Sequence, residues 1–262
     1  MSRRRALALP RIIGHRGAAG RAPENTLGGL RKAAELGATW VEVDVMLTAD
    51  DVPILHHDYN FARTCGHPAE VATLSSTAVA QLDAGAWFPA GSEARQWIGE
   101  VVPTLEQAVV ALSELRLNLN LELKPTPGRA AETAEVTLDL LTRIWPSGRP
   151  SPLISSFSGA CLEVARDLTP ELPRGRLWEE LPTDWQAEAD ALGCASIHLW
   201  CERLTHAQAL AVKAAGYRLA VFTVNEREDA ARFLEWGVDS LFTDLPDAIL
   251  PAGHSAAAWD GA

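Results

Sequence analysis

The sequence has few of the features that mark secreted, membrane or disulfide-rich proteins. No run of 18 uncharged apolar residues is long enough to cross a membrane. The apolar stretch after the basic residues 1–5 is too short for a secretory signal. Cysteine is scarce, with four residues in 262 and no CxxC pair or zinc-like spacing: Cys65, Cys161, Cys194 and Cys201. Scattered cysteines in a long chain are typical of reduced thiols, so we expect a cytoplasmic protein.

Positive charge is also scarce, and the familiar nucleotide loops are missing. The chain has 23 Lys and Arg against 34 Asp and Glu, a formal net charge of −11. Such a surface repels phosphate backbones, which disfavours nucleic acids and anionic membranes as partners. A protein of this charge that handles a phosphate must neutralise it locally. No G-x-G-x-x-G, GxxxxGK[ST] or G-x-S-x-G motif follows any expected strand.

Short apolar strands alternate with helical segments along most of the chain. We expect eight barrel strands, which is the count of a TIM (β/α)8 barrel, with an open doubly wound sheet as the alternative. The eight strands begin at Arg11, Trp40, Leu117, Pro152, Gly175, Ser196, Arg218 and Ser240. A further strand at 52–57 follows the second after only about four residues, too few for a parallel crossover. It is therefore expected to form an antiparallel hairpin.

Residues 58–103 form the longest stretch without this alternation. A segment of this length is usually a lid or a small subdomain. We predict a single domain over 1–262, with 58–103 inserted after the second barrel strand. Beyond the insertion, Thr104-x-x-Gln107 is a capping box that opens a helix. Asn225 is expected to cap a later helix.

Two of the expected strands carry polar side chains on one face. Because side chains alternate across a strand, Glu42 and Asp44 share the face opposite the valines of 41–45. In 117–124 leucine occupies every odd position, and the opposite face carries Asn118, Asn120, Glu122 and Lys124. The apolar face of a barrel strand must meet the helices, which turns these polar side chains inward. Active sites of such barrels lie at the carboxyl ends of the strands.

Glu42, Asp44 and Glu122 would repel one another at the barrel mouth unless a cation lies between them. A hard divalent cation with oxygen ligands, Mg²⁺ or Ca²⁺, is the simplest solution. No cluster of histidine or cysteine ligands in the sequence suggests zinc. The alternative is that Arg16 and Lys124 neutralise the carboxylates and that no metal binds.

Two histidines end neighbouring elements beside these charges. His15 closes the first strand before Arg16, and His57 ends the hairpin before Asp58. Such a pair suits acid–base cleavage of a phosphoester, one histidine removing a proton and the other donating one. His56, next to His57, is expected to face the opposite way. The other histidines are interpreted as structural or surface residues: His67, His198, His206 and His254.

A series of short motifs occurs in order along nearly the whole chain. They are His15-Arg16-Gly17, Pro23-Glu24-Asn25-Thr26, Glu42-x-Asp44, His57-Asp58 with Arg63-Thr64, Glu122-x-Lys124, Ser156-Phe157 and Thr243-Asp244-x-Pro246. This ordered set resembles the glycerophosphodiester phosphodiesterase family. Segments 171–175 and 192–198 resemble in particular the bacterial cytosolic type associated with glycerol-3-phosphate uptake, and no catalytic role is assigned to them.

The resemblance implies a TIM barrel that hydrolyses glycerophosphodiesters to sn-glycerol 3-phosphate and an alcohol. It implies metal ligation by Glu42, Asp44 and Glu122, catalysis by His15 and His57, and phosphate contacts by Arg16 and Lys124. Glu24 and Asn25 belong to a family motif near the site without a definite role. Tyr59 and Ala62 stand where relatives often carry acidic residues, which bears on the choice of alcohol.

The nucleophile and two other functions stay open at this point. The glycerol hydroxyl next to the phosphoester could attack phosphorus, with His15 as its base and His57 protonating the departing alcohol, or water could attack directly. A catalytically idle barrel that binds a phosphorylated metabolite is expected to have lost one of the site residues, and none is lost here. A lysophospholipid phosphodiesterase is the other alternative, although no amphipathic membrane helix is found.

Overall fold

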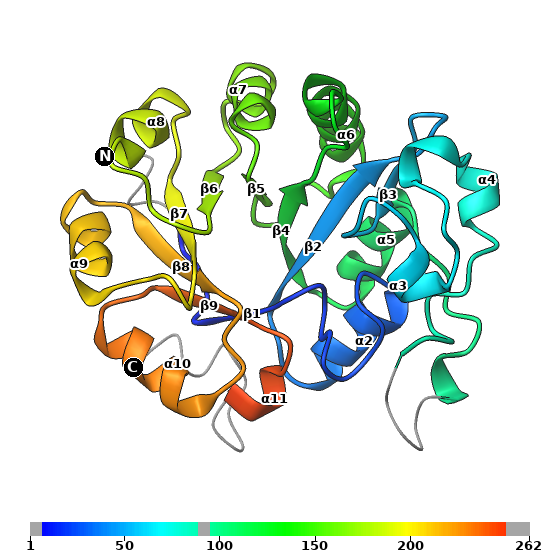
Figure 1. Ribbon diagram of the computed structural model, residues 1–262, viewed down its shortest axis with the longest axis horizontal. Helices are drawn as coiled ribbons and strands as arrows, with labels where there is room; N and C mark the ends of the chain where they lie inside the picture. The colour runs from blue at the N-terminus through cyan, green and yellow to red at the C-terminus, as the bar shows by residue number, and fades with distance from the viewer. Residues whose placement is uncertain (1–6, 89–94, 250–262) are drawn as a thin grey trace.

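The computed structural model describes residues 7–88 and 95–249, and its centre is a closed barrel of parallel strands (Figure 1). The strands are β1 (Ile12–Gly14), β2 (Trp40–Leu47), β4 (Asn118–Leu123), β5 (Leu153–Ser156), β6 (Arg174–Trp178), β7 (Ser196–Trp200), β8 (Arg218–Phe222) and β9 (Ser240–Thr243). They follow one another around the barrel in chain order, and β1 pairs with both β2 and β9. This closure excludes the open sheet and confirms the TIM barrel.

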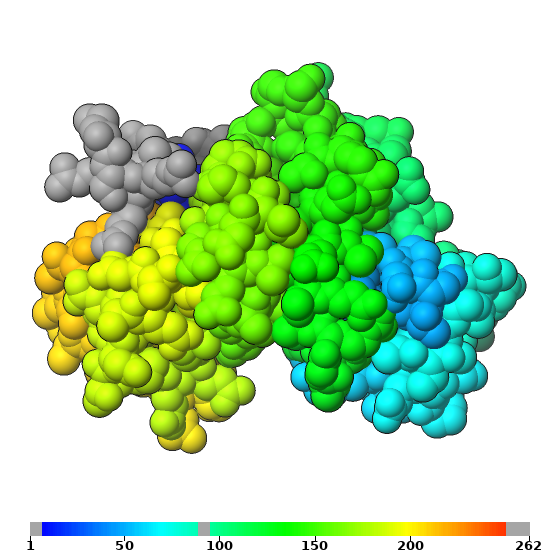
Figure 2. All heavy atoms as spheres, turned by 90° about the horizontal axis from the view of Figure 1, so that it is seen from above, coloured from blue at the N-terminus to red at the C-terminus, as the bar shows by residue number. Residues whose placement is uncertain are grey.

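Helices form the outer layer of the barrel (Figure 1). They are α2 (Leu27–Glu35), α5 (Leu105–Glu114), α6 (Ala130–Ile144), α7 (Gly159–Leu168), α8 (Trp185–Ala191), α9 (His206–Ala214), α10 (Arg227–Glu235) and α11 (Pro246–Ile249). Figure 2 shows the segments of α6, α7 and α8 on the outer surface, with the hairpin and the insertion beside them. The predicted capping box of α5 is present, with Thr104 accepting from the Gln107 amide.

The start of α10 differs from the expectation. Glu226, not Asn225, is its N-cap residue. The Asn225 side-chain oxygen instead accepts a hydrogen bond of 2.9 Å from the backbone amide of Asp244. A side chain that already accepts from a distant amide does not cap the adjacent helix.

The two faces of the barrel strands pack against different partners. Val41, Val43 and Val45 are fully buried among the helices that cover β2 and β4. The alternating residues point into the barrel, where its lower part is filled by a separate apolar cluster of Ile13, Trp40, Leu153, Ala195, Ala220 and Phe242. The barrel is therefore closed by packed side chains below the polar residues of its mouth.

The hairpin strand β3 (Pro53–Leu55) pairs antiparallel with the end of β2, as predicted. The segment that follows contains α3 (Ala62–Cys65), the 3₁₀ turn η1 (Val71–Thr73) and α4 (Ser76–Val79). It has its own small core against the hairpin, formed by Met46, Ile54, Phe61, Val71, Val79, Ala84 and Val102. This packing fixes residues 57–59 at the mouth of the barrel.

None of the helices in the described ranges combines the length and the apolar character that crossing a membrane requires.

Candidate active site

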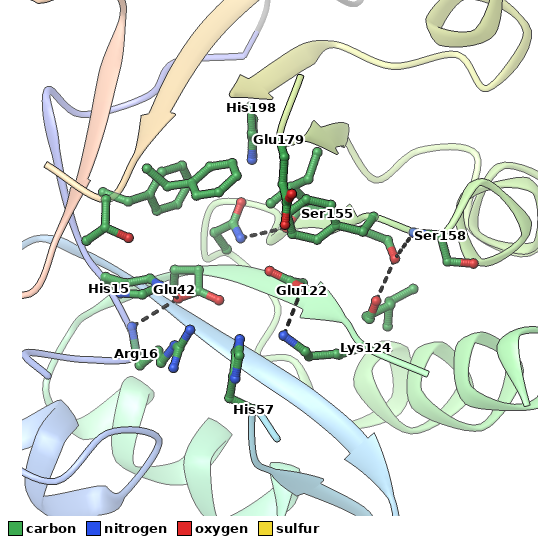
Figure 3. A pocket seen from close by; sticks show the side chains of 18 of the residues that line it. His15, Arg16, Glu42, His57, Glu122, Lys124, Ser155, Ser158, Glu179 and His198 are labelled. Atoms are coloured by element: carbon green, nitrogen blue, oxygen red, sulfur yellow. Dashed lines mark hydrogen bonds and ion pairs between the residues drawn. The ribbon is translucent and has the colours of Figure 1, made fainter. Parts of the chain in front are cut away.

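A cavity of about 550 Å³ opens where the barrel strands end (Figure 3). Charged and titratable side chains line one wall: His15, Arg16, Glu42, His57, Glu122 and Lys124. The other wall is more apolar and includes Phe157, Leu177 and Phe222, with Glu179 among them. The inward direction predicted from strand alternation thus brings the candidate residues of β2 and β4 into one cavity.

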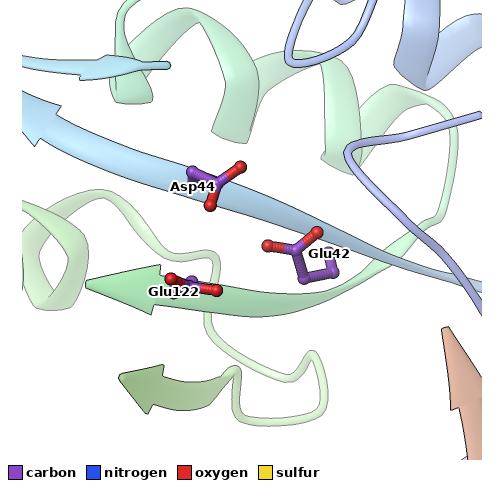
Figure 4. A group of neighbouring side chains, drawn as sticks. All are labelled: Glu42, Asp44 and Glu122. Carbon is purple, nitrogen blue, oxygen red and sulfur yellow. The ribbon is translucent and has the colours of Figure 1, made fainter. Parts of the chain in front are cut away.

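Three carboxylates meet at this end of the barrel (Figure 4), and two of them, Glu42 and Glu122, line the cavity. Each of Glu42, Asp44 and Glu122 offers an oxygen within 4.8 Å of the others, and all three are buried. Their closeness follows from the parallel register of β2 and β4, in which Asp44 lies beside Glu122. These are the residues predicted to hold a divalent cation.

The two positively charged side chains of the site, Arg16 and Lys124, act mainly on Asp44. Arg16 Nε lies 3.3 Å from Asp44 Oδ2, and Lys124 Nζ lies 3.8 Å from Asp44 Oδ1 and 4.0 Å from Glu122 Oε1. Burial acts to raise the pKa of Asp44, but Arg16, Lys124 and His57 together lower it below its usual value. The neighbouring positive charges therefore keep Asp44 ionised in spite of its burial.

The negative charges of Glu42 and Glu122 are compensated less by neighbouring positive charges than that of Asp44. Burial, with the negative charge of Asp44 adding to it, raises the pKa of Glu122 to about 8. Burial and the charges of Asp44 and Glu122 raise the pKa of Glu42 well above its usual value. Glu42 Oε2 accepts from the Arg16 amide at 2.9 Å, whereas Oε1 has no hydrogen-bond partner in the described part of the chain. An all-oxygen set with an unused buried ligand atom fits a hard divalent cation.

The Glu24-Asn25 motif holds this cluster in place. Asn25 adopts a left-handed backbone conformation with φ of 54°, donates to Asp44 Oδ2 at 2.9 Å and accepts from the Asp44 amide at 3.1 Å. Glu24 accepts hydrogen bonds from Arg16 at 2.9 Å and from Arg63 at 2.6 Å. The motif therefore positions the Asp44 carboxylate and the Arg16 guanidinium.

His15 is backed by a carboxylate that sequence reasoning left without a role. Its Nδ1 donates to Asp244 Oδ1 at 2.7 Å, and Nε2 lies 4.0 Å from Glu42 Oε2. Burial acts to raise the pKa of Asp244, but hydrogen bonds from His15 and Asn225 leave it below its usual value. A carboxylate on Nδ1 fixes the tautomer and directs Nε2 toward the pocket.

His57 has a similar arrangement and lies between Arg16 and Lys124 in the view of Figure 3. Its Nδ1 donates to Asp58 Oδ1 at 2.7 Å, and Arg63 in turn donates to Asp58 at 2.8 Å. Burial lowers the pKa of His57, and the positive charges of Arg16 and Lys124 contribute to the decrease.

His56 turns away from the cavity, as strand alternation predicted. It is buried against the ring of Phe61 and donates through Nε2 to the Asn60 carbonyl at 3.0 Å. Of the positions flagged for the alcohol, Tyr59 lines the cavity, whereas Ala62 lies exposed in α3.

The lower part of the cavity contains polar residues for which sequence reasoning proposed no function. His198 was interpreted as structural or surface, yet it lines the cavity together with Asn120 and Ser155. The inward parity of Asn120 was visible in the leucine alternation of 117–124. The sequence carried the same signal for His198, which alternates with the apolar Ile197 and Leu199 in the strand 196–200, but its interpretation as a structural or surface residue did not use that signal. His254 lies outside the described residues.

Comparison with known proteins identifies relatives along almost the whole chain. A model of the glycerophosphoryl diester phosphodiesterase family matches residues 15–248. A glycerophosphodiester phosphodiesterase of Caldanaerobacter subterraneus is 28% identical over 240 residues, covering 91% of this chain and 96% of the relative. A phosphodiesterase of Oleispira antarctica, solved in complex with the product sn-glycerol-3-phosphate, has a TM-score of 0.87 and 37% identity. That match covers 92% of this chain and 95% of the other.

The raised pKa of Glu122 predicts that this residue contributes less and less to the stability of the metal-free protein as pH rises. Between the usual glutamate value of 4.5 and about 8, the unfolded chain loses the Glu122 proton while the folded protein keeps it. The contribution of Glu122 to the free energy of unfolding therefore decreases over this range. The lowered pKa values of His56, His57 and His198 act in the opposite direction below about pH 6.5, so the comparison with Glu122→Gln isolates the Glu122 contribution. In chelator, Glu122→Gln should reduce this decrease and stabilise the protein at pH 8 by on the order of 2 kcal/mol.

Urea denaturation from pH 5 to pH 8 measures this effect. Glu163→Gln, which removes an exposed carboxylate on α7, is the control and should follow the wild type. Parallel pH profiles for the wild type and Glu122→Gln would show that Glu122 is ionised throughout.

Proposed function

The chain belongs to the glycerophosphoryl diester phosphodiesterase family, and from this premise we propose metal-dependent hydrolysis of glycerophosphodiesters with His15 and His57 as the acid–base pair. The observation that carries the proposal is one cavity lined by two carboxylate-backed histidines and by Glu42 and Glu122, which form a buried cluster with Asp44. The products would be sn-glycerol 3-phosphate and an alcohol. The Oleispira antarctica relative solved with that product supports this assignment.

Glu42, Asp44 and Glu122 would hold the cation, Mg²⁺ or Ca²⁺. When bound, it would offset the repulsion among the carboxylates and act as a Lewis acid toward oxygen atoms of the substrate. The carboxylates fit this role because Arg16 and Lys124 compensate chiefly Asp44, which leaves Glu42 and Glu122 with raised pKa values. This imbalance disfavours the alternative in which Arg16 and Lys124 alone neutralise the carboxylates and no metal binds.

The histidines would exchange protons with the substrate through Nε2. His15 is suited to remove a proton, because Asp244 on its Nδ1 stabilises the imidazolium that forms. His57 is suited to protonate the departing alcohol, because burial and its cationic neighbours lower its pKa, so that protonated His57 is a stronger acid. If the glycerol hydroxyl attacks phosphorus, the alcohol leaves and a cyclic phosphate of glycerol forms. Water would then open this cyclic phosphate, with the roles of the two histidines reversed.

Arg16 and Lys124 would stabilise the negative charge that grows on the phosphoryl oxygens. Arg16 is held by Glu24 and Asp44, so its guanidinium is oriented before substrate binds. Figure 3 shows Arg16, His57 and Lys124 along the same side of the cavity. The site therefore supplies local positive charge within a protein of net charge −11.

The barrel and the insertion both contribute to the site. Asp58 and Arg63, which orient His57, lie in the segment 58–103, whereas the carboxylates lie on barrel strands. We therefore propose that the barrel and the insertion act as one catalytic domain. A catalytically idle barrel is disfavoured, because both histidines, Arg16, Lys124, Glu42 and Glu122 line one cavity, and Asp44 is clustered with Glu42 and Glu122.

Metal removal tests the proposal directly. In a coupled assay for released glycerol 3-phosphate, excess chelator should abolish turnover of the choline, ethanolamine, glycerol and inositol diesters. Added Mg²⁺ or Ca²⁺ should restore it and should also raise the unfolding temperature. Chelator saturated with metal beforehand is the control. Full turnover in excess chelator would contradict the metal site.

Adjacent histidines provide a matched pair of variants. His57→Ala should lower kcat by about 10²–10⁴-fold with little effect on folding, because its loss removes a proton donor. His56→Ala should lower the free energy of unfolding by about 1–3 kcal/mol but keep kcat per folded molecule, because His56 packs outside the cavity. Steady-state kinetics and urea denaturation of both variants check the ranking. The opposite ranking would assign the proton transfer to His56.

A substrate without the adjacent glycerol hydroxyl identifies the nucleophile. If that hydroxyl attacks phosphorus, the 2-deoxy diester should bind but react at least about 100-fold more slowly than the parent. Equal rates for the two substrates would show that water is the nucleophile. The measurement is single-turnover cleavage alongside competitive inhibition of the parent reaction.

A further inference from the structure

The lower end of the cavity is a polar surface that the proposed chemistry does not use. We define the pocket floor as Asn120 on β4, Ser155 on β5 and His198 on β7, all of which line the cavity. All three are at least 99% buried. Figure 3 shows the His198 ring extending from its strand toward the cavity, on the side of Ser155.

A glycine makes room for the His198 ring. A Cβ atom on Gly175 would lie 2.6 Å from His198 Nε2, a distance that real side chains do not tolerate. The same Nε2 is hydrogen-bonded to Ser196 Oγ at 2.9 Å. Segments 171–175 and 192–198, singled out in the sequence without a role, thus cooperate to place one imidazole inside the barrel.

Two polar atoms of the floor have no partner in the described ranges. Asn120 donates through Nδ2 to Ser155 Oγ at 2.8 Å, but its Oδ1 is unpaired. His198 is bonded through Nε2, but its Nδ1 is unpaired. Buried polar atoms are almost always hydrogen-bonded, so a bound group is expected here. A hydroxyl both donates and accepts, and it can therefore partner the amide oxygen and either tautomer of the ring.

The floor carries no formal charge. Burial lowers the pKa of His198 to about 3, so the ring is neutral at physiological pH. Asn120 and Ser155 are neutral as well. A cationic alcohol such as choline would lose hydration here without gaining a counter-charge. The more apolar wall of the cavity offers a cationic alcohol better contacts. Glu179 is an exposed carboxylate on that wall, and Phe157 is an exposed aromatic ring.

The depth of the floor matches a three-carbon polyol. Asn120 precedes the carboxylate Glu122 by two residues on β4, a separation of about 7 Å along a strand. The barrel is closed at this end by Phe242, which lines the cavity beside the His198 ring, and by the buried side chains of Ile13 and Leu153. A glycerol group that starts at a phosphate beside the carboxylates can reach Asn120, but an acyl chain on its far oxygen would meet this packed layer.

We propose that Asn120 and His198 on the pocket floor bind the terminal hydroxyl of the glycerol group, which makes this chain select for that hydroxyl and against an acyl group in its place. Asn120 and His198 are the specificity-determining residues, and Gly175 is a positioning residue for His198. The inference rests on the proposed function, because it assumes that the phosphate binds beside the three carboxylates.

Two substrate analogues test the floor with the intact enzyme. The first replaces the glycerol of glycerophosphocholine by propane-1,2-diol, which keeps the adjacent hydroxyl and removes the terminal one. The wild type should lose about 10–100-fold in kcat/KM on this analogue, because buried floor atoms remain unpaired. The second is 1-butyryl-glycerophosphocholine, a monomeric lysophospholipid, which should not be turned over measurably.

Variants at His198 connect this selectivity to the floor. His198→Leu should lower kcat/KM for the parent substrate by about the same factor as removal of the terminal hydroxyl lowers it for the wild type. The variant should therefore cleave the parent and the analogue with similar kcat/KM values. His198→Asn keeps a polar atom near the position of Nδ1 and should recover part of the preference. Should His198→Leu fail to fold, Asn120→Ala should show the same loss of discrimination.

Equilibrium binding separates this proposal from the proposed function. With Mg²⁺ present, calorimetry should show about 10–100-fold tighter binding of sn-glycerol 3-phosphate than of propane-1,2-diol phosphate. That preference would stand even if no diester were turned over, in which case only the hydrolytic assignment fails. Equal binding and equal kcat/KM for parent and analogue, or ready cleavage of the butyryl substrate, would overturn the role of the floor.

Discussion

The burial of three carboxylates within 4.8 Å of one another is the constraint on which the rest of the site depends. Negative charges buried this close together are energetically costly, because they have lost their hydration and repel one another strongly in a medium of low dielectric constant. The neighbouring groups lower that cost unevenly. Arg16, Lys124 and Asn25 stabilise the charge of Asp44, while Glu42 and Glu122 respond by raised pKa values. Because Glu42 and Glu122 receive less of this compensation, their ionised forms are unfavourable in the empty site and favourable beside a divalent cation.

A second pattern extends outward from this centre. Each histidine has a carboxylate on Nδ1, and a further donor holds each carboxylate: Asn225 for Asp244 and Arg63 for Asp58. Asn225 lies in the loop between β8 and α10, and Arg63 lies in the insertion. Both histidines are thereby oriented before any ligand arrives, so the arrangement does not require reorganisation during proton transfer.

The interior of the barrel is divided into parts with different properties. The mouth is charged, the pocket floor is polar and neutral, and the layer below is apolar and packed. This gradient follows the strands, because inward positions two residues apart lie at successive depths. On β4 it runs from Lys124 through Glu122 to Asn120. The gradient orients a substrate with a charged centre and a neutral polyol end.

The sequence by itself determined the barrel, its eight strands, the hairpin, and the inward faces of β2 and β4, because period-two alternation is a local property of consecutive residues. It also indicated Glu42, Asp44, Glu122, His15 and His57 as candidates. Only the tertiary structure decided that Asp244 supports His15, that Asn225 holds Asp244 rather than capping α10, and that His198 lies over Gly175. Those relations join side chains from different strands and loops, and closure of the barrel, not local periodicity, sets which of them meet.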